Sequence, residues 1–129
     1  MEKHTDNQMT QQDMIDKSYK MLTRKELFDI LSDTTITGIY LYNNSWYKYM
    51  VNSFSDGNIE GQNNVGSFNE GRWQVNSDAS MSIEWDGYWE DWTGFAYEVD
   101  GKIMFFDTTT KKWRTTYTLV ENGILPTDI

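Results

Sequence analysis

The densest group of side chains that could do chemistry lies in one short segment, residues 84–92. It reads Glu-Trp-Asp-Gly-Tyr-Trp-Glu-Asp-Trp, so four carboxylates and four aromatic rings occupy nine positions. Aromatic anchors dominate interface energetics, and carboxylates attract a basic partner and speed its association. In the alternative interpretation, Trp89 or Trp92 folds over the end of the domain as a plug, and the acids lie in water. The pattern predicts a recognition loop whose binding residues are Asp86, Tyr88, Trp89, Glu90, Asp91 and Trp92.

Calcium binding and glycoside hydrolysis are two other kinds of chemistry that the same carboxylates could carry out. Calcium binds many oxygen ligands on a constrained loop. Asp86, Glu90 and Asp91 could supply some of them, but the EF-hand spacing is absent. A glycosidase needs two carboxylates at a set separation, which the sequence does not give for Asp86 and Glu90. Sugar binding on exposed Trp and Tyr, without hydrolysis, is a further alternative.

The rest of the composition excludes several reaction types. The sequence has one histidine, His4, and no cysteine. Ser-His-Asp catalysis, thiolate nucleophiles and zinc–thiolate sites are therefore excluded. The glycines at 57, 61 and 66 lie among predicted strand turns and not ahead of a helix, so no phosphate-binding loop is predicted. We predict no catalytic residue, no metal site and no cofactor, and a protein that is not an enzyme.

The charge narrows the choice of partners. The net charge is −9 and the pI is about 4.4, so the protein repels phosphate backbones and anionic membrane surfaces. We expect no nucleic acid partner and no membrane insertion, since no apolar run approaches the ~20 residues that span a bilayer. A basic protein or a small apolar ligand is compatible with this negative charge as a partner. As written, the amino terminus lacks an apolar signal segment and predicts a cytoplasmic protein; the mature form of an exported protein is the alternative.

The first third of the chain predicts a short arm and two helices. Residues 1–12 are polar and predict a disordered arm, which leaves residues 13–129 as a single domain. Apolar positions predict a helix over about 13–21. Thr23 and Glu26 have the spacing of a capping box, and Leu22 and Leu27 that of a hydrophobic staple. A second helix is therefore predicted up to Leu31, with Leu27, Phe28, Ile30 and Leu31 toward the core.

From Ile36 onward the hydrophobic period changes to two, which is typical of strands. Short links, among them Asn43-Asn44, Asp56-Gly57 and Asp100-Gly101, favour tight hairpins. The fold class that follows is mainly β, with short N-terminal helices and an antiparallel up-and-down barrel, because closure removes the exposed edges of such a sheet. About eight strands are predicted: Ile36–Tyr42, Trp46–Phe54, Asn58–Asn63, Gly71–Val75, Ser80–Trp85, Gly94–Val99, Lys102–Phe106 and Trp113–Val120.

Alternation within these runs predicts which side chains point inward. The run from Ile103 to Phe106 is apolar on both faces, so we expect the N-terminal helix to cover its outer side. An eight-stranded barrel is either filled by side chains or holds one small ligand; the many large rings favour a mostly filled interior. The inward side chains are predicted to be Trp73, Val75, Met81, Ile83, Trp85, Phe95, Tyr97, Val99, Trp113, Tyr117 and Leu119.

Several segments, in this order, resemble small bacterial lipocalin-like (calycin-type) domains. The opening helix and first strand, Leu22–Gly38, are similar to the start of such domains. Similar too are the Asp-Gly hairpin within Phe54–Gly61, the strand Gly71–Val75, the strand tryptophan Trp85 and the hairpin at Val99–Gly101. The resemblance implies a lipocalin-like barrel and transfers no catalytic residue. Many such domains are exported and some carry cysteines, which this chain lacks.

Together these observations predict a binding protein and not a catalyst. The first hypothesis is a module that holds a protein partner through its acidic, aromatic loop at the barrel mouth, as an inhibitor, immunity or adaptor protein. The second is a carrier with a cavity for a small apolar ligand. The third is a carbohydrate-binding or hydrolytic protein.

Overall fold

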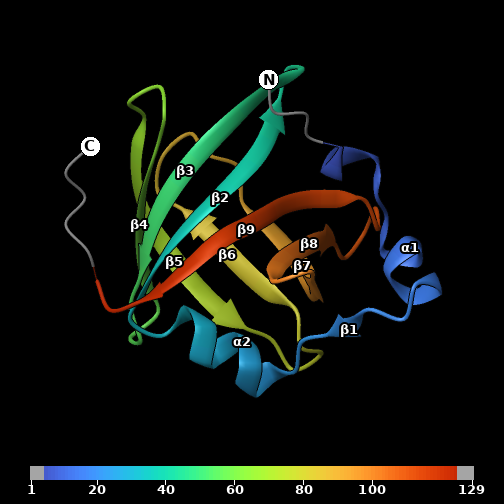
Figure 1. Ribbon diagram of the computed structural model, residues 1–129. Coiled ribbons are helices and arrows are strands. Elements are labelled where there is room, and N and C mark those ends of the chain that lie inside the picture. The colour runs from blue at the N-terminus through green and yellow to red at the C-terminus, as the bar shows by residue number, and fades with distance from the viewer. Residues whose placement is uncertain (1–4, 125–129) are drawn as a thin grey trace.

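The computed structural model describes residues 5–124, and strands β2 to β9 form a closed antiparallel barrel (Figure 1). Each strand pairs with the next in sequence, and β9 returns to pair with β2, from Thr34↔Asn122 to Ile39↔Thr116. This confirms the predicted mainly β, up-and-down barrel. The strands are β2 (Thr34–Tyr42), β3 (Ser45–Ser53), β4 (Asn58–Asn63), β5 (Phe68–Val75), β6 (Met81–Trp85), β7 (Trp92–Val99), β8 (Lys102–Asp107) and β9 (Trp113–Asn122).

The predicted tight turns have the backbone that such hairpins require. Asn43 and Asn44 join β2 to β3 and both have positive φ, and so do Asp100 and Gly101 between β7 and β8. Two consecutive left-handed residues match the right-handed twist of the flanking strands. The local turn chemistry therefore fixes the register of these hairpins.

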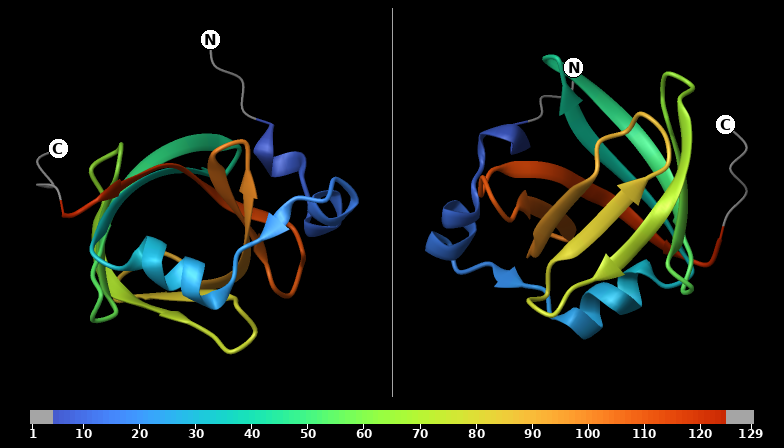
Figure 2. Two further views of the ribbon diagram at one scale, coloured as in Figure 1. Left: turned by 60° about the horizontal axis from the view of Figure 1, so that its bottom comes forward. Right: turned by 180° about the vertical axis from the view of Figure 1, so that it is seen from behind.

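One end of the barrel is closed by helix α2 (Arg24–Leu31). Figure 2 shows α2 lying across the opening of the ring of strands. Leu27 and Leu31 are fully buried on its inner side, in one cluster with Ile36 and Trp73 from the barrel. Phe28 was predicted to be buried but is 47% exposed, because it lies on the flank of the helix with its ring 5.7 Å from that of Trp73.

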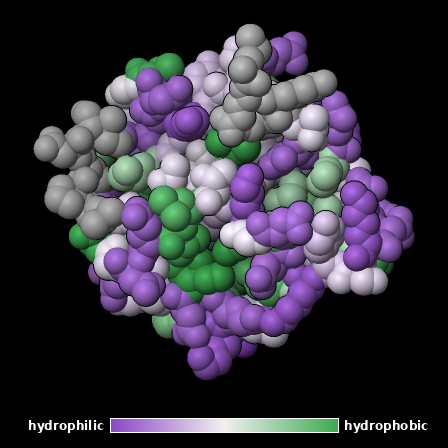
Figure 3. All heavy atoms as spheres, in the orientation of Figure 1, coloured by the Kyte–Doolittle hydropathy of each residue, from purple (hydrophilic) through white to green (hydrophobic). Residues whose placement is uncertain are grey.

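A groove runs along the outside of this closed end. Figure 3 shows hydrophobic side chains gathered on the face that carries α2 and β9. The groove has a volume of about 520 Å³ and lies between α2 and strands β8 and β9. Its apolar lining includes Leu22, Ile30, Ile103, Leu119 and Val120.

The N-terminal elements differ from the prediction in their boundaries. A 3-10 turn, η1 (Asp6–Gln8), precedes α1 (Gln11–Asp16), and Lys20–Met21 forms the short strand β1, which pairs with the end of β7. The predicted helix over 13–21 is therefore wrong at both ends. Thr10 and Asp13 form a capping box that starts the helix earlier, and Ser18, with φ 59°, turns the chain before β1.

The predicted disordered arm lies partly outside the described residues, which begin at Thr5. From Thr5 to Gln12 the chain is bonded to the barrel. The Asp6 carboxylate accepts a hydrogen bond from Thr116 Oγ1 at 2.7 Å, and the Trp113 amide donates to the Met9 carbonyl at 3.3 Å. These contacts give the polar arm partners that its composition does not reveal.

A second apolar cluster lies between α1 and the outer face of β7 and β8. Met14 of α1 is fully buried there against Tyr97, Val99, Met104 and Phe106. The N-terminal helix therefore covers the outer side of β8, as predicted.

The inward orientation predicted for Phe95, Tyr97 and Val99 is wrong. Because the second cluster buries this face as well, alternation alone could not tell the two faces of β7 apart.

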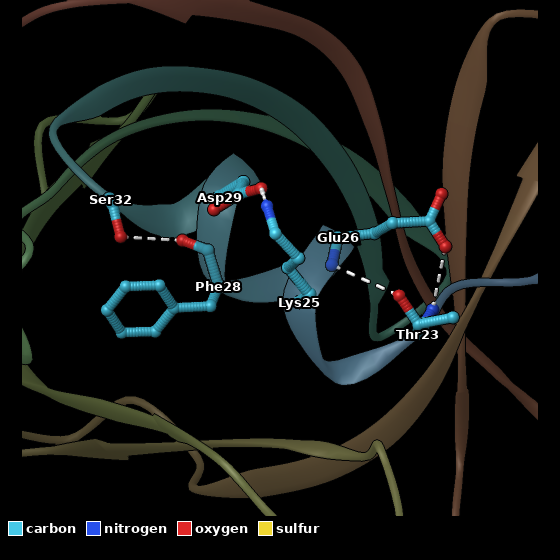
Figure 4. Close-up of polar contacts among 6 residues, drawn as sticks. All are labelled: Thr23, Lys25, Glu26, Phe28, Asp29 and Ser32. Atoms are coloured by element: carbon cyan, nitrogen blue, oxygen red, sulfur yellow. Dashed lines mark hydrogen bonds and ion pairs between the residues drawn. The ribbon is translucent and has the colours of Figure 1, made fainter.

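The start of α2 is fixed by its predicted capping box, drawn in Figure 4. The Glu26 amide donates to Thr23 Oγ1 at 3.2 Å, and the Thr23 amide donates to Glu26 Oε1 at 3.0 Å. The Lys20 ammonium donates to the other Glu26 oxygen at 2.7 Å. Lys25 and Asp29 form an exposed ion pair one turn apart on the same helix.

Substitution Glu26→Gln is expected to lower the melting temperature in a pH-dependent way. The hydrogen bonds from Lys20 and Thr23 hold the pKa of Glu26 at about 2, below its ordinary 4.5. A depressed pKa stabilises the fold fully above about pH 4.5, and this contribution is lost as the pH falls toward 2. Gln retains the capping geometry, so the variant isolates the charge. Thermal unfolding should show a gap between the two proteins at pH 7 that closes toward pH 2. A gap that stays constant contradicts the assignment.

Candidate functional site

The barrel is hollow at the end opposite α2. The β2–β3, β4–β5 and β6–β7 loops lie at this end (Figures 1 and 2), around a cavity of about 650 Å³, here called the mouth cavity. The expectation of a mostly filled barrel holds only for the α2 end. The mouth cavity is lined by Tyr40, Leu41, Tyr42, Tyr47, Tyr49, Val51, Asn63, Val65, Ile83, Trp85, Tyr88, Trp89, Glu90, Trp92, Arg114, Thr115 and Tyr117.

The rings of Trp92 and Tyr117 line the floor of the mouth cavity and pack on the buried ring of Phe105. The centroid of Phe105 lies 5.3 Å from that of Trp92 and 4.6 Å from that of Tyr117. The Tyr117 hydroxyl donates to the Met81 sulfur at 3.8 Å. Burial raises the pKa of Tyr117 well above its ordinary value, so this hydroxyl stays neutral. The floor therefore holds no charged group.

Tyrosines from β2 and β3 form one wall. The Tyr40 ring stacks on Tyr47 at 5.2 Å and lies 5.8 Å from Tyr49. The Thr115 hydroxyl donates to the Ile39 carbonyl at 2.7 Å, so in its 2.6 Å contact with Tyr49 the tyrosine is the donor. Burial raises the pKa of Tyr49, which is consistent with a neutral donor.

A glycine makes room for this wall. A Cβ atom on Gly38 of β2 would lie 2.3 Å from the Tyr49 hydroxyl oxygen, nearer than any real contact allows. Gly38 therefore lets the Tyr49 ring lie across β2 and bring its hydroxyl to Thr115 of β9.

The β6–β7 loop folds back over the opposite wall. The Trp89 indole packs edge-on against Trp85 at 4.7 Å, and its Nε1 donates to Ser67 Oγ at 2.9 Å. Asp91 Oδ1 accepts from the Trp85 amide at 2.7 Å, and Asn69 Oδ1 accepts from the Gly87 amide at 2.9 Å. Hydrogen bonds to two neighbouring strands thus hold the loop over the cavity.

The six residues predicted for the recognition loop divide into two groups. Tyr88, Trp89, Glu90 and Trp92 line the mouth cavity, whereas Asp86 and Asp91 do not. Trp89 packs against the ring of Trp85, and Trp92 against that of Phe105. Tyr88 is fully exposed at the rim.

The sequence did not assign Arg114 to the cavity. Alternation placed Trp113 inside the barrel and Arg114 outside. Two β-bulges in β9 change which side of the sheet each of its side chains lies on. The bulge at Arg114 lies between the pairs Phe105↔Thr115 and Phe106↔Trp113, and a second one follows at Thr118. Trp113 packs on the outer cluster, and Leu119 is 51% exposed. No residue in the sequence signals a bulge here.

The carboxylates of the loop do not converge on a metal position. Asp91 accepts from a backbone amide, and Glu90 lies 3.5 Å from the Arg114 guanidinium. Within residues 5–124 no three His, Cys, Asp or Glu side chains form a group that could hold a metal ion. The calcium interpretation therefore gains no support from the geometry.

Comparison of the chain with models of known protein families, with curated proteins and with solved structures gives no match. The site must therefore be interpreted from its own geometry. In the part of the chain that the structure describes, the longest helix, α2, has eight residues, and no helix has the length and apolarity to cross a bilayer.

Proposed function

We propose that this protein binds a small, largely apolar molecule in the mouth cavity. The observation that carries the proposal is the open-mouthed cavity itself, with a volume of about 650 Å³ and a lining made mainly of aromatic side chains. Pockets for small ligands typically measure about 300–1,000 Å³ and combine apolar walls with a few polar groups. Here the polar groups are contributed mainly by Tyr40, Asn63, Thr115 and Arg114.

The geometry supports this carrier hypothesis better than the protein-partner hypothesis that the sequence put first. Anchors of a protein interface must be free to enter a partner, but Trp89 and Trp92 pack within the barrel. Glu90 faces Arg114 of its own chain. Tyr88 is therefore the one aromatic ring of the predicted loop that stays fully exposed.

One observation still favours a protein partner as a second candidate. Exposed apolar side chains surround the mouth: Tyr42 and Val65 beside the cavity, Phe68 at the start of β5, and Tyr88. Exposed apolar groups of this kind occur at interaction surfaces. They would equally form an entrance for an apolar ligand.

We also propose that the chain belongs to the small bacterial lipocalin-like domains. A closed eight-stranded meander that opens with a capped helix supports the resemblance to small bacterial lipocalin-like domains. Barrels of this size can hold one small ligand in the interior.

Fluorescence titration with N-phenyl-1-naphthylamine, a neutral apolar dye, tests the proposal. We expect saturable binding of one dye per protein with a Kd in the micromolar range, and quenching of the tryptophan emission, because Trp85, Trp89 and Trp92 line the cavity. Absence of saturable binding, with the protein folded by circular dichroism, would remove the carrier hypothesis.

A further inference from the structure

We propose that the ligand carries a carboxylate or another anionic group, and that Arg114 binds this group at the cavity mouth. The inference rests on the proposed function and adds the chemical class of the ligand. Among the described residues that line the mouth cavity, Arg114 is the one cation, in a chain whose net charge is −9.

The backbone of β9 is built to present this side chain. Arg114 is the extra residue of a β-bulge, since Phe105 pairs with Thr115 and Phe106 with Trp113. A bulge re-aims a side chain that regular alternation would send to the other face, and bulges are frequent beside binding sites. The side chain is only 30% exposed, and its guanidinium lies 5.7 Å from the centre of the Trp92 ring.

The guanidinium has unused hydrogen-bonding capacity. Arg has five N–H donors in a planar fork that matches a carboxylate. Within residues 5–124 the Arg114 guanidinium makes no hydrogen bond, and its one ion-pair partner is Glu90 at 3.5 Å. The Glu90 side chain is 74% exposed, so solvent screens this pair and it contributes little.

A second donor faces the same cavity. Asn63 Oδ1 accepts from the Val65 and Ser67 amides, which leaves Asn63 Nδ2 to donate to the Tyr40 hydroxyl at 3.1 Å. Tyr40 is therefore an acceptor in this bond, and its own proton has no acceptor among residues 5–124. Arg114 is also near enough to Tyr49 to oppose the rise of the Tyr49 pKa. A cation and a neutral O–H donor thus line the same cavity, where both can donate hydrogen bonds to a ligand.

Glu90 completes the inference as a competitor for the ligand. It lies on the loop that covers the cavity and is paired with Arg114. An anionic ligand that displaces Glu90 would gain a partly buried, charge-assisted contact, which is stronger than the exposed ion pair it replaces. An apolar molecule without the anion would bind the same cavity with no help from Arg114.

Two dyes with the same ring system separate these contributions. N-phenyl-1-naphthylamine is neutral, and 8-anilinonaphthalene-1-sulfonate adds one sulfonate. We expect the wild type to bind the sulfonate dye at least about tenfold more tightly, the effect of one charge-assisted hydrogen bond. Arg114→Gln should remove this preference, measured as the ratio of its affinities for the two dyes. Glu90→Gln should strengthen binding of the sulfonate dye alone.

Lys48→Gln is the matched control. It makes the same change of charge on β3, where Lys48 is exposed and does not line the cavity, so it should retain the preference. Circular dichroism checks that Arg114→Gln is folded, so its ratio of the two affinities can be compared with that of the wild type. The inference is overturned if Arg114→Gln still prefers the sulfonate dye, or if the wild type binds the neutral dye without preferring the sulfonate dye. Neither result removes the carrier hypothesis. Failure of the neutral dye to bind removes both.

Discussion

Substitution Phe105→Ala is expected to lower the free energy of unfolding by about 3–5 kcal/mol. Phe105 is 0% exposed and packs between the rings of Trp92 and Tyr117, at 5.3 and 4.6 Å. Removal of its ring costs the apolar burial and leaves a void in the core behind Trp92 and Tyr117, which the surrounding barrel strands restrain from collapsing. Urea unfolding followed by tryptophan fluorescence would measure the change.

Phe68→Ala is the control for this prediction. Phe68 is also on a barrel strand but is 51% exposed, so its loss should change the free energy of unfolding by less than about 1 kcal/mol. Similar losses for the two variants would contradict the assignment of Phe105 to the centre of the barrel core.

Substitution Ile83→Trp is expected to weaken binding of the neutral dye at least tenfold, or about 1.4 kcal/mol. Ile83 is buried on β6 and lines the mouth cavity. The larger indole at this position would occupy space that the ligand needs. Overpacking also costs about 1–3 kcal/mol of stability, so binding should be measured by titration at a temperature where the melting curve shows the variant folded.

Gln74→Trp provides the same new indole outside the barrel. Gln74 is exposed on β5 and does not line the cavity. This variant should bind the dye with the affinity of the wild type. If Ile83→Trp binds the dye as well as Gln74→Trp does, the dye lies elsewhere on the protein.

The parts of this fold that depend on local rules could be predicted from the sequence. Thr23 and Glu26 fixed the start of α2 because a capping box needs only a few residues. The turn at Asn43 and Asn44 followed from their tolerance of positive φ. Each predicted strand has a counterpart, although β5 begins at Phe68 and not at Gly71. Closure of the barrel followed from the number of strands and the cost of bare edges.

The parts that depend on register could not be predicted. The bulge at Arg114 reverses the faces assigned to Trp113 and Arg114, and it arises from pairing with β8 and not from a residue type. On β7, alternation could not tell a face buried in the barrel from one buried under α1, so Tyr97 was placed on the wrong side.

Only part of the candidate site could be predicted, because the rest depends on how the strands pair. Trp89 and Glu90 lie at the barrel mouth, as the loop position implied. The tyrosines on β2 and β3 that form the other wall, Tyr40, Tyr47 and Tyr49, are far from the loop in sequence. Their convergence follows from closure of the barrel, which single-sequence patterns do not show in detail.

The most direct test of the carrier hypothesis is to locate the neutral dye by nuclear Overhauser effects in solution. The mouth cavity and the groove along α2 offer two apolar places, lined by different methyl groups. We predict contacts from N-phenyl-1-naphthylamine to the methyls of Val51 and Ile83, inside the barrel. Contacts to Leu22 and Val120 in the groove instead would contradict the hypothesis.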